Sequence, residues 1–72
     1  MSLQVLEGLC KSLDKLIEED PSDPLTLKVF GAVQHLANRL YLKGDVGIKI
    51  GKITDRISFR EFGGALIVDI NA

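Results

Sequence analysis

A change in the spacing of apolar residues at Gly44 constrains the fold more than any other feature of the chain. Before Gly44, apolar residues recur every three or four positions, as on the buried face of an amphipathic helix. After it, they recur at every second position, as in a strand with one buried face. The spacing therefore predicts an α+β fold in the order ααβββ, a helical hairpin packed on a three-stranded antiparallel meander.

The length of 72 residues allows one small domain, residues 1–72, with a limited core. Domains of this size are usually stabilised further by disulfides, a metal or a second subunit. Cys10 is the single cysteine, so no disulfide can form within the chain, and Cys10 with His35 is too small a ligand set for structural zinc. We therefore expect no metal or cofactor, and oligomerisation remains as the stabilising device.

Charge and hydropathy limit the kinds of partner and the cellular location that we expect. Nine basic and ten acidic side chains leave a formal net charge of −1, which disfavours non-specific binding to nucleic acid. The N-terminal residues do not follow the pattern of a signal peptide, and the longest apolar run, residues 65–68, is too short to cross a bilayer. We expect no membrane association, and the single cysteine is typical of a protein in the reducing cytoplasm.

The first helix is predicted over residues 2–20, with Ser2 as its N-terminal cap. Pro21 ends this helix, because the residue before a proline is disfavoured in the helical conformation. The predicted core face consists of Leu3, Leu6, Cys10, Leu13 and Ile17.

The second helix is predicted over residues 24–43. Asp23 can cap it, Pro24 suits its first position, and Gly44 suits its C-terminal end. The short connection from the first helix predicts an antiparallel helical hairpin. The predicted core face consists of Val29, Phe30, Val33, Leu36, Ala37 and Leu40.

The second helix carries a further set of residues nearly opposite that core face. Leu27 and Leu42 are apolar on a side that would otherwise meet solvent, and Gly31 costs about 1 kcal/mol relative to alanine in a helix interior. One interpretation is a contact seam at which Gly31 allows close approach of another backbone; the other is an ordinary solvent face with scattered leucines. The predicted helix seam consists of Leu27, Gly31, His35, Asn38 and Leu42.

Three strands are predicted within residues 46–71. Gly63-Gly64 is a strong signal for a two-residue hairpin turn. That turn pairs Phe59 with Val68 and Ile57 with Ile70, so apolar residues face one another.

Thr54-Asp55 is a weaker turn signal and leaves the register of the first strand open. A two-residue turn there would place Ile50 opposite Phe59, Gly47 opposite Phe62 and Lys49 opposite Arg60. The inner face of the sheet would then consist of Ile48, Ile50, Ile57, Phe59, Leu66, Val68 and Ile70.

The outer face of the predicted sheet carries a second candidate surface, formed by Lys49, Arg56, Arg60 and Phe62. Lys49 opposite Arg60 is unfavourable unless an anion lies between them, and Phe62 offers a ring on which a base could stack. These features are similar to those of a surface for single-stranded nucleic acid. The alternative is an ordinary solvated sheet face, which the weak overall basicity favours.

Motifs for catalysis or cofactor binding do not emerge from the sequence. Residues 47–52 depart from a P-loop in glycine spacing. A calcium-binding loop that started in the acidic cluster, at Asp20, would lack the glycine at its sixth position and the glutamate at its twelfth. Cys10 and His35 are expected on opposite sides of the helical hairpin, too far apart to act as a catalytic pair.

The sequence therefore favours a non-enzymatic protein-interaction module that self-associates as a homodimer, with another protein as a further candidate partner. Contact is expected through the helix seam, through the outer face of the sheet, or through residues 66–70 as an exposed edge strand. The alternative is a nucleic-acid-binding accessory protein. Enzymatic activity is not expected, because a pocket would have to form between subunits.

Overall fold

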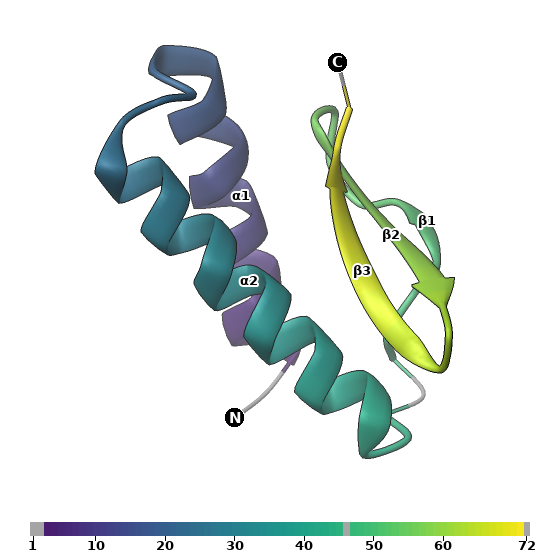
Figure 1. Ribbon diagram of the computed structural model, residues 1–72. Coiled ribbons are helices and arrows are strands. Elements are labelled where there is room, and N and C mark those ends of the chain that lie inside the picture. The colour runs from purple at the N-terminus through teal and green to yellow at the C-terminus, as the bar shows by residue number, and fades with distance from the viewer. Residues whose placement is uncertain (1–2, 46, 72) are drawn as a thin grey trace.

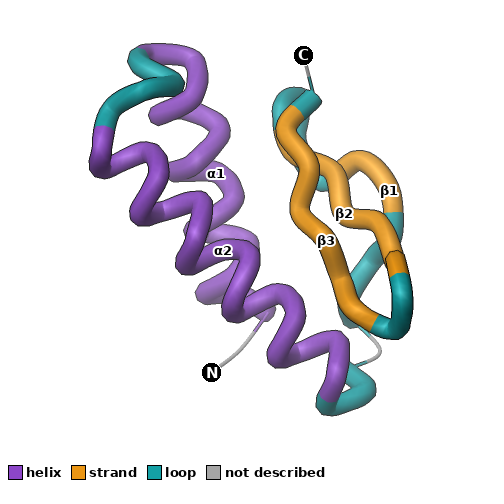
Figure 2. Tube along the Cα trace, viewed as in Figure 1, coloured by secondary structure: helices purple, strands orange, loops and turns teal. Residues whose placement is uncertain are grey.

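The computed structural model describes residues 3–45 and 47–71, and it confirms the predicted fold (Figure 1). The helices α1 (Leu3–Glu19) and α2 (Pro24–Leu42) form a hairpin, and the strands β1 (Gly51–Lys52), β2 (Ile57–Phe62) and β3 (Ala65–Ile70) form an antiparallel sheet in the order β1-β2-β3. The two helices make one layer and the sheet the other (Figure 2). The predicted cap Ser2 and the predicted first strand residue, Val46, lie outside the described residues.

The turn between the helices is fixed by side-chain hydrogen bonds. The backbone N–H of Leu25 donates to Asp23 Oδ1 at 2.8 Å, which confirms Asp23 as the N-cap of α2, with Pro24 in the first turn. Thr26 is buried, and its hydroxyl donates to the carbonyl of Asp20 at 2.8 Å. This bond joins the first turn of α2 to the end of α1.

Gly44 ends α2 as predicted. Its φ is +79°, and its N–H donates to the carbonyl of Tyr41, while the N–H of Asp45 donates to the carbonyl of Leu40. This pair of bonds is a Schellman motif, in which a left-handed residue satisfies the last carbonyls of a helix. The chain thereby reverses toward the sheet.

The core lies between the two layers and draws on both helices and on β2 and β3. Leu13, Val33, Ile57 and Leu66 are completely buried. The predicted inward faces of α1, α2, β2 and β3 therefore meet as expected. The buried apolar residues are Leu6, Cys10, Leu13, Val33, Leu36, Ala37, Leu40, Ile57, Phe59, Leu66 and Val68.

The hairpin between β2 and β3 has the predicted register, with Phe59 opposite Val68 and Ile57 opposite Ile70. Gly63 and Gly64 both adopt positive φ, +60° and +80°, as a type I′ turn requires. Ile70, at the end of the edge strand, is nevertheless exposed and does not join the core.

The predicted register of the first strand is wrong by one residue. Gly51, not Ile50, lies opposite Phe59, and β1 is only Gly51–Lys52. The turn is one residue longer than predicted, because the N–H groups of Ile53 and Thr54 both donate to the carbonyl of Ile57.

This shift changes which side chains reach the core, because a slip of one residue exchanges the two faces of a strand. Ile50 is 58% exposed and does not join the inner face, whereas Ile53 packs against the core. Ile48 is partly buried against the core, as predicted, although it lies outside the strands. The predicted pairing of Lys49 with Arg60 is also wrong, since Lys49 precedes β1.

Candidate functional site

The residues of the predicted helix seam do not all lie free on the surface of the structure. Leu27, Gly31, His35 and Leu42 are all exposed, and a Cβ added at Gly31 would meet nothing within 4 Å in the described chain. Asn38 is different, because its Oδ1 accepts the backbone N–H of Leu66 at 2.9 Å. Asn38 therefore binds within the chain, and the surface left exposed consists of the other members of the seam.

Gln34 and Asn38 together cover part of the free edge of β3. Gln34 Nε2 donates to the carbonyl of Leu66 at 2.6 Å, and its Oε1 accepts the N–H of Val68 at 2.9 Å. Helix side chains thus occupy backbone groups that another strand would need for pairing. The prediction that residues 66–70 offer an open edge is wrong at Leu66 and Val68.

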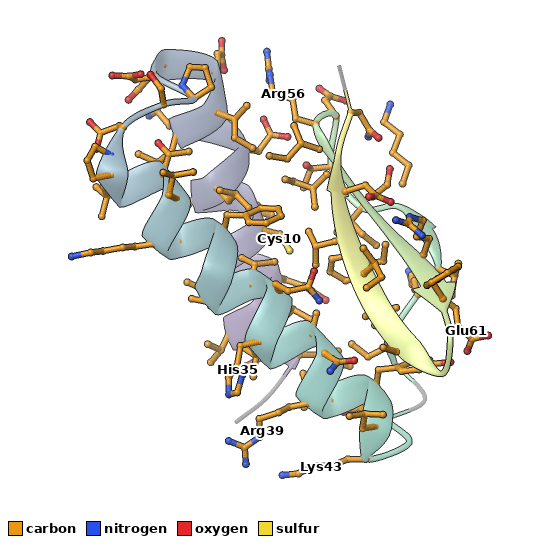
Figure 3. The ribbon with its side chains drawn as sticks, viewed as in Figure 1. Cys10, His35, Arg39, Lys43, Arg56 and Glu61 are labelled. Atoms are coloured by element: carbon orange, nitrogen blue, oxygen red, sulfur yellow. The ribbon has the colours of Figure 1, made fainter. Side chains whose placement is uncertain are left out.

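The exposed side of α2 is basic. Lys28, His35, Arg39 and Lys43 are all exposed, and residues 24–43 contain no aspartate or glutamate. His35, Arg39 and Lys43 point away from the sheet (Figure 3). Two copies that met through α2 would bring like charges together, which disfavours self-association through this side.

The two arginines of the predicted nucleic-acid surface already have carboxylate partners. Arg60 Nε lies 2.6 Å from Asp69 Oδ2, and its guanidinium stacks over the Phe62 ring with the Cζ atom 5.8 Å from the ring centroid. Arg56 Nη1 lies 2.9 Å from Asp14 Oδ1. In both arginines the charge is therefore partly balanced by a carboxylate of the same chain.

What remains on the far side of the sheet is an uncovered face that mixes apolar and charged side chains. Phe62 is 70% exposed, and Ile67, which lies opposite Arg60, is partly exposed; both lie on the turn side of the ion pair between Arg60 and Asp69. The register of β2 and β3 defines this outer sheet face, which consists of Ser58, Arg60, Phe62, Ala65, Ile67 and Asp69.

A cleft that the sequence did not indicate lies between α1 and residues 47–54, and its volume is about 280 Å³. The buried side chains of Leu6, Cys10 and Phe59 form its floor. It forms within one chain, so the expectation that a pocket would require two subunits is wrong. The nearest sequence signal is Gly47, where a Cβ would overlap the side chain of Leu3, so that glycine lets this segment approach α1.

Cys10 is not chemically activated in this cleft. Its side chain is 1% exposed, and burial, with a smaller contribution from Glu7, raises the pKa of the thiol to about 11. The thiol is therefore protonated at neutral pH and acts as a small apolar group.

Among residues 3–45 and 47–71, side chains of His, Cys, Asp and Glu form no cluster of three or more that could hold a metal ion. Within the same ranges, no helix is long and apolar enough to span a bilayer. No model of a known protein family, no curated protein and no solved structure matches the chain.

Proposed function

We propose that the protein is a non-enzymatic interaction module that forms a homodimer through its outer sheet face. The observation that carries this proposal is the 70% exposure of Phe62 on the uncovered side of a two-layer domain. Exposed aromatic side chains on an apolar patch are typical of interfaces, because burying their area is the main favourable term in association.

The charge on this face suits contact with an identical copy. Arg60 and Asp69 balance one another, so two outer sheet faces related by a two-fold axis meet without net repulsion. The basic side of α2 lacks this balance. Of the three contacts expected from the sequence, the outer sheet face is therefore the one we assign to self-association.

The size of the interface is realistic for so small a chain. A stable interface buries about 800 Å² on each partner. The accessible surface of the chain is 4695 Å², so the contact would cover about one sixth of it. We also propose that the protein is cytoplasmic, and the free thiol of Cys10 supports this location.

The alternative of nucleic-acid binding has less support. Lys49 does not lie opposite Arg60, and both Arg56 and Arg60 are paired with carboxylates. The stacking platform at Phe62 remains, but the arginine beside it already makes an ion pair with Asp69.

Solution mass from size-exclusion chromatography with light scattering tests the homodimer. We expect a dimer at both low and high salt, because an apolar contact is little affected by ionic screening. Phe62→Glu should give a folded monomer, since it buries a charge in the contact. Leu42→Glu is the matched control: Leu42 is 64% exposed, but lies on α2, and its substitution should leave the dimer intact.

Two outcomes would overturn the proposal. A wild-type protein that stays monomeric as its concentration is raised would remove self-association altogether. A dimer that survives Phe62→Glu but dissociates with Leu42→Glu would move the contact to α2.

A further inference from the structure

The cleft between α1 and residues 47–54 combines an apolar floor with a cationic rim. Leu6, Cys10 and Phe59 close the floor, and each is at most 3% exposed. Lys11 lines the cleft from α1, and Lys49 and Lys52 line it from the opposite wall. An apolar cleft with a few converging polar groups is the usual form of a small-molecule site.

Two of these lysines are available to a ligand. Lys52 lies 3.6 Å from Asp55, but within the described part of the chain neither Lys11 nor Lys49 has a carboxylate within 4 Å. Glu7 also lines the cleft, so the rim carries more positive than negative charge. A single anionic group between Lys11 and Lys49 would interact favourably with both walls.

The floor supplies no reactive group. The Cys10 thiol is buried and protonated at neutral pH, so it cannot serve as a nucleophile or as a soft metal ligand. We therefore expect the floor to contribute shape and apolar contact to a ligand.

We propose that this cleft binds a small organic anion, a carboxylate attached to an aromatic ring or a short hydrocarbon chain. The apolar part would lie against Leu6, Cys10 and Phe59, and the carboxylate would lie between Lys11 and Lys49. Size agrees with this class, because an apolar cavity of about 150 Å³ holds benzene. A cleft of about 280 Å³ has room for a ring and a short acid arm.

Binding should also stabilise the fold. Residues 47–50 make no strand pairing, so the wall that carries Lys49 is joined to the domain by fewer backbone hydrogen bonds than β2 or β3. A ligand that bridges this wall and α1 binds only the folded state, and so it raises the melting temperature increasingly as its concentration exceeds the dissociation constant.

Hydrocinnamate, which has one phenyl ring and one carboxylate, is a suitable probe, and hydrocinnamyl alcohol is its neutral control. We expect hydrocinnamate to shift the backbone amide resonances of Cys10, Ile53 and Phe59 in a saturable way in heteronuclear NMR, and to raise the melting temperature. The alcohol should bind about tenfold more weakly, because it retains the ring and lacks the charge.

Two double variants distinguish binding in the cleft from non-specific attraction of the anion to exposed lysines. Lys11→Gln with Lys49→Gln should weaken hydrocinnamate binding about tenfold. Lys28→Gln with Lys43→Gln removes the same charge from α2 and should leave the affinity unchanged. All four lysines are exposed, so both double variants are expected to fold.

The proposal is overturned if hydrocinnamate causes no saturable shifts, if the shifts map away from the cleft, or if the two double variants weaken binding equally. Because the cleft lies within one chain, these outcomes do not depend on the homodimer. A monomer that binds hydrocinnamate would contradict only the proposed function, and a dimer that does not would contradict only the ligand site.

Discussion

The side-chain amide of Gln34 lies beside Val68 as the backbone of a neighbouring strand would. Its Oε1 accepts the N–H of Val68, and its Nε2 donates to the carbonyl of Leu66, while Asn38 accepts the N–H of Leu66. One turn of α2 thereby satisfies three backbone groups at the edge of β3. These bonds fix how the helical layer sits on the sheet, and they obstruct pairing of that edge with another chain.

Removal of the Gln34 amide should therefore destabilise the domain more than its partly exposed position suggests. Gln34→Ala leaves the N–H of Val68 and the carbonyl of Leu66 without partners, and we expect a loss of about 1–2 kcal/mol in the free energy of unfolding. Urea denaturation measures this loss. His35→Ala is the matched control on the exposed side of the same helix, with an expected change within about 0.5 kcal/mol. Equal effects of the two substitutions would show that the edge bonds contribute nothing.

Asp14 connects α1 to the loop between β1 and β2, and this connection should make stability depend on pH. The pKa of Asp14 is lowered, and the main cause is a hydrogen bond with the Thr54 side chain. The backbone N–H and the guanidinium of Arg56 lower this pKa further, whereas desolvation raises it. A carboxyl whose pKa is lower in the folded state stabilises the fold above its unfolded pKa of about 3.9. That stabilisation is lost as the pH falls through the folded pKa.

The free energy of unfolding of the wild type should accordingly fall as the pH is lowered from about 5 to about 2, and protonation of Asp14 should contribute to this fall. Asp14→Asn should be less stable than the wild type near neutral pH, and the difference should shrink as the pH falls. Glu19→Gln, at the exposed end of α1, serves as control and should keep the wild-type pH dependence. A constant difference between Asp14→Asn and the wild type across this range would contradict the role assigned to Asp14.

Local signals in the sequence were sufficient for the helices and for the hairpin of β2 and β3. Asp23, Pro24 and Gly44 act through their own backbone conformation and hydrogen bonds, so their positions predict where α2 begins and ends. The glycine pair at the β2–β3 turn likewise predicts the register, because it requires positive φ at both positions.

The parts that sequence reasoning missed depend on contacts between residues far apart in the chain. Asn38 lies on the side of α2 that periodicity assigned to a seam, yet it binds Leu66, 28 residues away. The register of β1 depends on a turn that Asp14 holds from α1, through its bond to the N–H of Arg56. The cleft was missed for the same reason, since its two walls come from α1 and residues 47–54.

The turn between β2 and β3 gives a prediction about backbone conformation alone. A Cβ added at Gly63 would meet nothing within 4 Å in the described chain, but its φ of +60° is unfavourable for a β-branched residue. Gly63→Val should cost about 1–2 kcal/mol, whereas Gly63→Asn should be nearly neutral because asparagine tolerates this conformation. Comparison of the two variants by urea denaturation tests this, and equal stabilities would contradict it.

Cys10 should react with thiol reagents only when the domain opens. Its side chain is 1% exposed, and burial raises the pKa of the thiol to about 11, so the folded protein presents neither an accessible sulfur nor a thiolate at neutral pH. Labelling with iodoacetamide, which is small and uncharged, should be slow in buffer and fast in urea, and its rate in buffer should rise in destabilised variants such as Gln34→Ala. Rapid labelling of the stable wild type would contradict this burial.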